Sequence, residues 1–122
     1  MTNGSQCPKK TPLHATHLES NAKMTEFCGW DMPVQYSNGI IAEVRAVRES
    51  AGIFDVSHMG RIEFGGPGTK YFLGTVLSAN LMALKIGRSK YNFICNKEGG
   101  IIDDAMIYRI EDERFLLVVN AG

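Results

Sequence analysis

Several features that would mark a definite class of protein are missing from this sequence of 122 residues. Its three cysteines are widely spaced and form no CxxC pair, so neither a zinc site nor a disulfide framework is indicated. Thirteen basic residues balance thirteen acidic ones, which excludes the strongly basic surface typical of nucleic-acid binding. No apolar run approaches the roughly 20 residues that cross a bilayer, so no membrane association is expected.

The signatures of common catalytic and nucleotide-binding sites are missing too. The sequence has no GxSxG elbow, GxGxxG loop or Walker loop. Ser57 and His58 are adjacent, and adjacent side chains of an extended chain point to opposite faces, which disfavours a hydrolytic pair. His14 and His17 lie one helical turn apart, a spacing that metals can use. Because no third ligand is evident, we expect a partly exposed helix face there and no metal.

What is present fits an ordinary globular domain. Apolar residues make up 44% of the chain and charged residues 21%, close to the average for such domains. Residues 1–10 are polar and lack the apolar core of a signal peptide and the Arg-rich pattern of a transit peptide. We therefore expect a flexible leader over 1–10, a folded region over 11–122, and a reducing, cytoplasmic location.

The order of helical and strand patterns predicts an α+β fold, an antiparallel sheet with two main helices packed on it. A first short helix begins with Thr11 as its N-cap. Glycine and proline predict a break in regular structure over residues 28–33. The predicted helices span residues 11–20, 39–51 and 67–77, and the predicted strands span residues 23–27, 61–64, 91–95, 101–110 and 115–120.

Both main helices carry apolar residues at helical spacing, which predicts one buried face on each. Gly52 follows the first of them, where a left-handed C-terminal cap belongs. The apolar residues are Ile40, Ile41, Val44, Val47 and Ala51 in the first helix and Phe72, Leu73, Val76 and Leu77 in the second.

The strand over residues 101–110 holds the most informative acid. Alternation puts Asp103 and Asp104 on opposite faces, each among apolar neighbours. Arg109 shares the face of Asp103, whereas the face of Asp104 carries no basic residue. Burying an unpaired carboxylate costs several kcal/mol, so a partner, solvent or a ligand must offset the cost at Asp104.

A tight hairpin over residues 96–100 would fix the partners of this strand. Tyr91, Phe93 and Asp104 would then share one surface, and aromatic rings beside a lone acid suit a flat, nitrogen-bearing ligand. The alternative is a structural acid at the start of a strand, satisfied by loop amides. The predicted pairs are Cys95 with Ile102, Phe93 with Asp104 and Tyr91 with Met106.

Taken together, the motifs resemble the N-terminal part of the glycine cleavage system T protein family, the aminomethyltransferases. They occur in the family's order and spacing and cover about residues 11–122. The matching stretches are Thr11-Pro12-Leu13, Gly29-Trp30-Asp31-Met32-Pro33, Ala46-Val47-Arg48, Gly52-Ile53-Phe54-Asp55-Val56-Ser57-His58-Met59, Gly99-Gly100-Ile101-Ile102-Asp103-Asp104 and Val118-Val119-Asn120-Ala121.

The resemblance implies part of a larger folate-binding fold. Enzymes of this family take an aminomethyl group from the lipoyl arm of the H protein, release ammonia and pass the methylene unit to tetrahydrofolate. The resemblance implies that Asp104 is the catalytic acid against the pterin, that Tyr91 contacts folate, and that Met59, Val118 and Asn120 line the folate cavity. In this reading tetrahydrofolate and the lipoylated H protein are the partners, and no metal takes part.

Departures from the family pattern leave other readings open. Ala79-Asn80 stands where the family usually has Asn-Asp, and the family's other folate-binding residues fall beyond residue 122. We therefore expect a truncated chain that is inactive alone and that self-associates through open sheet edges. The alternatives are another folate-dependent enzyme, of the sarcosine or dimethylglycine dehydrogenase type or a dimethylsulfoniopropionate demethylase, and a folate-binding module without enzymatic activity.

Overall fold

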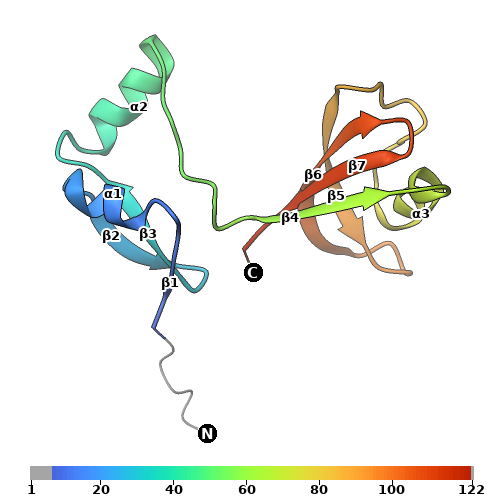
Figure 1. Cartoon of the computed structure of the whole chain (residues 1–122), viewed down its shortest axis with the longest axis horizontal. Coiled ribbons are helices and arrows are strands. Elements are labelled where there is room, and N and C mark those ends of the chain that lie inside the picture. The colour runs from blue at the N-terminus through green and yellow to red at the C-terminus, as the bar shows by residue number, and fades with distance from the viewer. Residues whose placement is uncertain (1–6, 122) are drawn as a thin grey trace, which may run out of the picture. The chain divides into compact units, whose positions relative to one another are not determined.

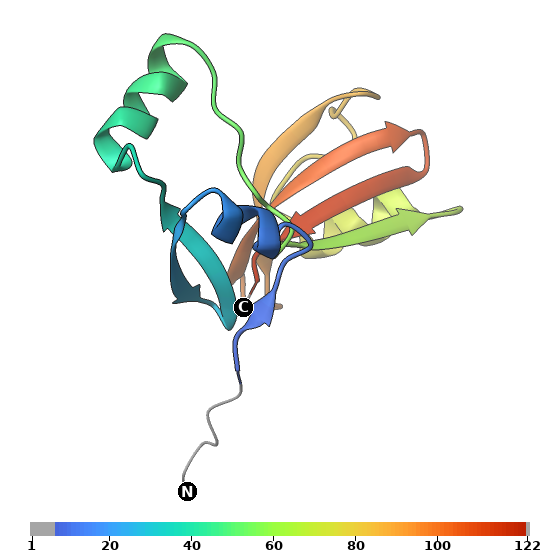
Figure 2. The same ribbon diagram turned by 60° about the vertical axis from the view of Figure 1, so that its left-hand side comes forward.

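The computed structural model describes residues 7–121, and these divide into two compact units. Unit 1 comprises residues up to His58 together with Ala121, and unit 2 runs from Met59 to Asn120 (Figures 1 and 2). The elements within the described residues are β1 (Lys9–Lys10), α1 (His14–Glu19), β2 (Lys23–Phe27), β3 (Trp30–Gln35), α2 (Ile40–Glu49), β4 (Gly60–Gly65), α3 (Thr69–Val76), β5 (Ser89–Cys95), β6 (Ile101–Glu111) and β7 (Arg114–Val119).

Unit 1 contains a small sheet with the strand order β1-β3-β2. Strand β2 pairs antiparallel with β3, and β1 pairs parallel with β3. The predicted break over residues 28–33 is wrong, because only Cys28 and Gly29 form the turn, with φ of 49° and 77°. Pro33 is tolerated inside β3 because the register shifts opposite it, between Lys23 and Met24.

The predicted leader over residues 1–10 falls partly outside the described residues. Within them, Lys9 and Lys10 form β1 and pair with Trp30 and Asp31 of β3. The ammonium of Lys9 also lies over the ring of Trp30, 5.5 Å from its centroid. The folded region of the chain therefore begins slightly before the predicted residue 11.

The helices of unit 1 differ from the predictions at their ends. Helix α1 begins with Leu13 in the cap position, and the Thr11 carbonyl accepts the His14 N–H at 3.1 Å, so the predicted Thr11 side-chain cap is wrong. Helix α2 matches its predicted position but ends at Glu49, with Ser50 as the residue after it at φ of −145°, and without the predicted left-handed cap at Gly52. Every residue of α2 is at least partly exposed, so its predicted apolar face is not buried within unit 1.

Unit 2 is a four-stranded antiparallel sheet in the order β4-β7-β6-β5. One face of this sheet packs against α3 and the loop that follows it. Leu73 of α3, Ile107 of β6 and Phe115 of β7 are fully buried there. The core of buried residues is Leu73, Leu77, Ala79, Leu81, Leu84, Ala105, Ile107, Phe115 and Leu117. Of the predicted apolar face of α3, Leu73 and Leu77 are buried, whereas Phe72 is about half exposed.

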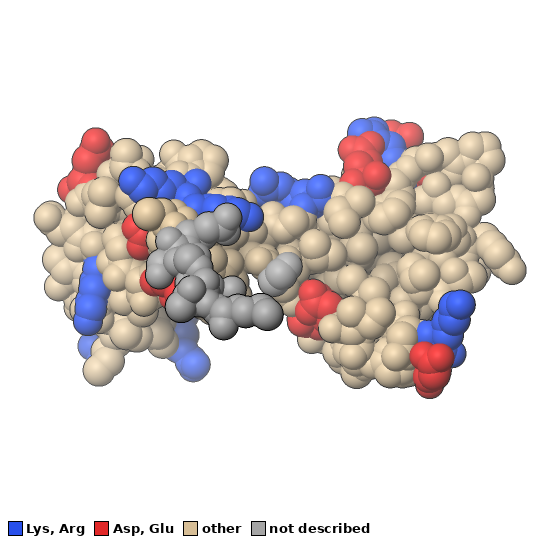
Figure 3. Space-filling view, turned by 90° about the horizontal axis from the view of Figure 1, so that it is seen from below, with Lys and Arg blue, Asp and Glu red and all other residues tan. Residues whose placement is uncertain are grey.

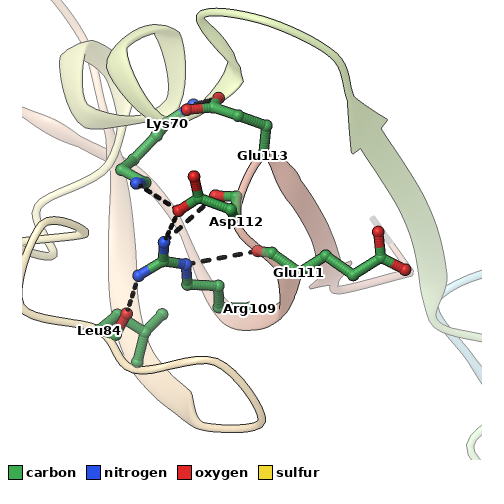
Figure 4. Close-up of polar contacts among 6 residues, drawn as sticks. All are labelled: Lys70, Leu84, Arg109, Glu111, Asp112 and Glu113. Atoms are coloured by element: carbon green, nitrogen blue, oxygen red, sulfur yellow. Dashed lines mark hydrogen bonds and ion pairs between the residues drawn. The ribbon is translucent and has the colours of Figure 1, made fainter.

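A cluster of polar contacts at the β6–β7 turn joins the sheet to α3 and to the loop that follows it (Figure 4). Arg109 donates a hydrogen bond to the Leu84 carbonyl at 2.7 Å and forms an ion pair with Asp112. Lys70, at the start of α3, donates to the same Asp112 carboxylate at 3.1 Å. Arg109 is thus paired with Asp112 and not with Asp103, its neighbour on the predicted face.

The predicted α+β class with antiparallel sheets is confirmed, with the two main helices divided between the units. At the right of Figure 3, acidic and basic side chains lie next to one another, as expected for a chain without net charge. Among residues 7–121, the helices are too short and too polar to cross a bilayer.

Candidate functional site

The face of the unit 2 sheet opposite the core carries the residues predicted to bind a ligand. We call it the site face. The predicted pairs Tyr91 with Met106 and Phe93 with Asp104 are both present, and Met106 pairs in turn with Val118 of β7. Alternation along β4 places Met59, next to the Gly60–Val119 pair, on the same side. The five predicted residues on the site face are Met59, Tyr91, Asp104, Val118 and Asn120.

The predicted register fails at the end of the hairpin. Cys95 pairs with Ile101 and not with Ile102, because β6 contains a bulge between the pairs Ile94–Asp103 and Cys95–Ile101. Gly99, with φ of 80°, supplies the left-handed residue of the turn. Alternation does not reveal this bulge, because Ile101 and Ile102 at its position are both apolar.

Asp104 is half buried, and one neutral donor holds its carboxylate. The side-chain amide of Asn120 donates to its Oδ1 at 2.8 Å. The Tyr91 hydroxyl lies near enough for this carboxylate to raise the pKa of Tyr91 above its ordinary value. The acid is therefore neither free in solvent nor paired with an arginine, and a carboxylate with about four acceptor positions keeps some for a ligand.

The surroundings of Asp104 are aromatic and apolar. The rings of Tyr91 and Phe93 meet edge to face, with centroids 5.6 Å apart and an angle of 76° between planes. Ile102 and Tyr108, on the same face of β6, are 66% and 40% exposed. On the outer side of β5, the backbone N–H of Ser78 donates a hydrogen bond to the Phe93 carbonyl at 2.9 Å and so restrains the backbone at Phe93. Around Asp104 the site face is thus open and largely apolar, and alternation also places Arg61, Glu63 and Arg114 on the same face of the sheet.

The described residues of this face fit a reduced pterin in chemical character. A pterin offers several N–H donors on a flat ring, and a carboxylate accepts such donors strongly. The aromatic edge formed by Tyr91 and Phe93 offers the apolar contact that a flat ring system needs. The face covers only one side of such a ligand, because its aromatic and aliphatic residues remain largely exposed.

Unit 1 contains a second polar group, built on a histidine. His17 is 6% exposed, and its ring lies between the Asp55 carboxylate, 2.9 Å from Nε2, and the Tyr36 hydroxyl, 2.8 Å from Nδ1. Burial raises the pKa of Asp55, but hydrogen bonds from Ser57 and His17 outweigh burial and leave it well below its ordinary value. We call these three residues, Tyr36, His17 and Asp55, the histidine clasp.

The predicted exposed face of α1 is therefore wrong. His14 is also buried, and its Nε2 lies 2.8 Å from the Asp31 carboxylate. Each histidine pairs with an acid far away in the sequence, by 17 and 38 positions. The spacing of His14 and His17 alone could not identify those partners, although the acids Asp31 and Asp55 both stand in motifs quoted above.

A hollow of about 730 Å³ lies within unit 1, between β3, α2 and the segment that follows α2. Apolar side chains form most of its wall, with Tyr36 and Asp55 of the histidine clasp among its lining residues. The five predicted site residues, all of them described, belong to unit 2 and do not line it.

Comparisons with known proteins agree with the resemblance. The chain is 51% identical over 114 residues to an aminomethyltransferase of Desulforamulus reducens and 52% identical to one of Deinococcus deserti, in each case over 93% of its length. A crystal structure of glycine cleavage system aminomethyltransferase T from Bartonella henselae superimposes with a TM-score of 0.88, at 41% identity and over 93% of this chain.

The match covers nearly all of this chain but only part of the length of each relative. The chain spans about a third of these relatives, 31% and 32% of the two aminomethyltransferases and 32% of the crystallised protein. The family described as the GCVT N-terminal domain matches residues 13–122, nearly the whole chain. The chain therefore belongs to the GCVT N-terminal domain family.

Proposed function

We propose that the site face forms part of the tetrahydrofolate site of an aminomethyltransferase of the glycine cleavage system. In this reaction an aminomethyl group on the lipoyl arm of the H protein loses ammonia, and its carbon passes to tetrahydrofolate as a methylene unit. The observation that carries the proposal is the anchored acid: Asp104 lies on an open, largely apolar part of the site face, held by Asn120 and close to the Tyr91 hydroxyl, with acceptor positions left for a ligand.

Asp104 has two roles in this proposal. As an acceptor it orients the N–H groups of the pterin and so places the reacting folate nitrogen. As a fixed negative charge it stabilises the positive charge that develops on the transferred carbon when ammonia leaves. Asn120 holds the carboxylate in place beside Tyr91, so that little reorganisation is needed when charge develops. Met59 and Val118 supply apolar contact.

The alternatives opened by the sequence are less well supported. The relatives quoted above are named aminomethyltransferases, which favours that activity over demethylation of other amines or of sulfonium compounds. A folate-binding module without activity would use the same face. An assay of the complete gene product with lipoylated H protein separates that module from an enzyme, because only an enzyme releases ammonia from the aminomethyl group.

Ligand-induced thermal stabilisation is the most direct test. At tetrahydrofolate concentrations of ten times Kd, binding to the folded state adds about 1.4 kcal/mol, so the unfolding midpoint should rise measurably. Asp104→Ala should abolish the rise, and Tyr71→Ala, on the exposed side of α3, should retain it. A rise of equal size in the Asp104→Ala variant would refute the role of this acid.

For the 122-residue chain alone we expect no turnover with H protein and at best weak folate affinity. One face of a ligand supplies too few contacts to offset the freedom lost on association. Sustained formation of methylenetetrahydrofolate by this chain would contradict that expectation.

We also propose that the chain self-associates, through β4 and not through β5. Both are edge strands of the unit 2 sheet, but the outer side of β5 is partly covered by the Leu77–Ile94 bridge and the Ser78–Phe93 hydrogen bond. Open edges invite pairing. A monomeric mass by light scattering at high concentration would contradict self-association.

A cytoplasmic location, expected from the isolated cysteines, remains part of the proposal.

A further inference from the structure

Asp103 is an acid beside the site face that the proposed function does not use. Strict alternation would direct its side chain to the core face of the sheet, where Ala105 and Ile107 are buried. The bulge at Ile102 lies directly before it, and bulges next to active sites often redirect a neighbouring side chain. The Asp103 carboxylate accordingly reaches Asn120, at the end of β7.

The contacts of Asp103 are specific. Its Oδ1 accepts the backbone N–H of Asp104 at 2.9 Å and the side-chain amide of Asn120 at 3.0 Å. The Asn120 nitrogen is also 2.8 Å from Asp104 Oδ1 and 3.3 Å from the Asp104 carbonyl. With acceptors on all these sides, the nitrogen and not the oxygen of the amide must face the two acids.

This arrangement brings two carboxylates to one amide nitrogen. Like charges so close together repel, and each would turn toward solvent if nothing held it. The two N–H bonds of Asn120 point at one oxygen from each acid and offset part of the repulsion. Arg109, which shares the predicted face of Asp103, is committed to Asp112, so among the described residues Asn120 is the side-chain donor that restrains Asp104.

We propose that Asp103 is a positioning residue for the folate site: it fixes the Asn120 amide, and through that amide it fixes the carboxylate of Asp104. The inference rests on the proposed function, since the purpose of a fixed Asp104 is to meet a pterin. It also changes the role of Asn120. Its nitrogen serves the two acids, so its contact with folate would be made through Oδ1.

The first part of the test needs no ligand. In NMR spectra, the two side-chain amide protons of Asn120 and the ring carbon bonded to oxygen in Tyr91 report the hydrogen bonds directly. Asp103→Asn keeps an acceptor oxygen and removes the charge, whereas Asp103→Ala removes the acceptor. We expect Asp103→Ala to reduce the separation of the Asn120 proton signals and to shift the Tyr91 signal, and Asp103→Asn to retain both.

The second part measures tetrahydrofolate affinity. Asp103→Ala should weaken binding about tenfold, the lower end of the effect seen when an orienting partner is lost, and Asp103→Asn should bind nearly as well as the unmodified chain. In an Asn120→Ala background, Asp103→Ala should have little further effect, because the two residues act through one contact. Equal weakening by both Asp103 variants, or additive losses in the double variant, would overturn the proposal.

The outcomes separate this inference from the proposed function. If the unmodified chain shows no tetrahydrofolate binding even at concentrations that detect weak affinity, while the NMR changes occur as expected, the positioning role stands and the folate assignment fails. If tetrahydrofolate binds and the Asn120 signals do not change in the Asp103→Ala variant, the positioning role fails and the folate assignment stands. Backbone amide signals of Ile107 and Phe115 check that the sheet remains folded. Should Asp103→Ala unfold it, Asp103→Ser is the substitute, since a serine is too short to reach Asn120.

Discussion

The two units of this chain are stabilised by different kinds of interaction. Unit 2 has a continuous apolar core in which Leu73, Ile107 and Phe115 are fully buried. Unit 1 has a small sheet and a helix, α2, whose apolar residues remain open, Ile41 being 79% exposed. Its buried centre is instead polar, formed by two histidines that each bind an acid.

This difference bears on function. A site that must hold a carboxylate in one position needs a rigid support, and the candidate site lies on the unit with the apolar core. The polar pairs of unit 1 are directional contacts that fix one segment to another, here Asp55 after α2 to His17 in α1. Unit 1 should therefore depend on few interactions and respond to pH, whereas unit 2 should depend on packing.

A matched pair of isoleucines tests the contrast most strongly. Ile107 in unit 2 is fully buried and Ile41 in unit 1 is 79% exposed. Ile107→Ala should lower the free energy of unfolding by about 2–5 kcal/mol, because it removes apolar contacts and leaves a cavity. Ile41→Ala should change it by less than about 0.5 kcal/mol. Urea unfolding followed by circular dichroism measures both, and a large loss from Ile41→Ala would show that α2 is buried in solution.

The histidine clasp should matter next most. The Asp55 side chain is 1% exposed, and Asp55→Ala leaves the buried His17 ring without its acceptor, which should cost about 1–3 kcal/mol. Trp30 is the only tryptophan and lies in unit 1, so its fluorescence reports unfolding of that unit.

Asp31→Ala is the matched control for Asp55→Ala. The Asp31 side chain also pairs with a histidine but is 29% exposed, so water can replace the lost contact and the effect should be smaller. Equal losses from the two variants would mean that burial does not set the strength of these pairs.

Acid should weaken unit 1 through the same carboxylate. The pKa of Asp55 is lower in the folded chain than in the unfolded one, where it is about 3.9. As the pH falls below that value, the unfolded state takes up the proton first, so the contribution of Asp55 is complete above about pH 5 and is lost progressively at lower pH. Trp30 fluorescence during acid titration should show this loss, and Asp55→Asn should flatten it.

The sequence predicted those features that depend on local pattern. Alternation in β6 and the glycine of the 96–100 turn were enough to pair Phe93 with Asp104 and Tyr91 with Met106. The family motif directed attention to Asp104, and the unusual pairing of acid and apolar residues had done so independently.

Other features depend on contacts between distant residues and left no local signal. The partner of His17 lies 38 positions away, and the bulge in β6 falls at two consecutive apolar residues, Ile101 and Ile102, where alternation gives no sign of it. Of the predicted apolar stripe of α2, Ile40, Val44 and Val47 line the hollow of unit 1, whereas Ile41 does not. A stripe does not tell what covers that face, so its burial within the unit was wrongly predicted.

The smallest effect is expected at an exposed ion pair on α2. Arg45 and Glu49 are one helical turn apart on α2, with Nε and Oε1 separated by 4.0 Å and side chains 69% and 71% exposed. Water screens such a pair, so Glu49→Ala should change the free energy of unfolding by less than about 0.5 kcal/mol. Urea unfolding followed by Trp30 fluorescence provides the measurement. A loss above 1 kcal/mol would mean that α2 unfolds together with the histidine clasp, and the contrast between an open helix and a polar centre would then no longer describe unit 1.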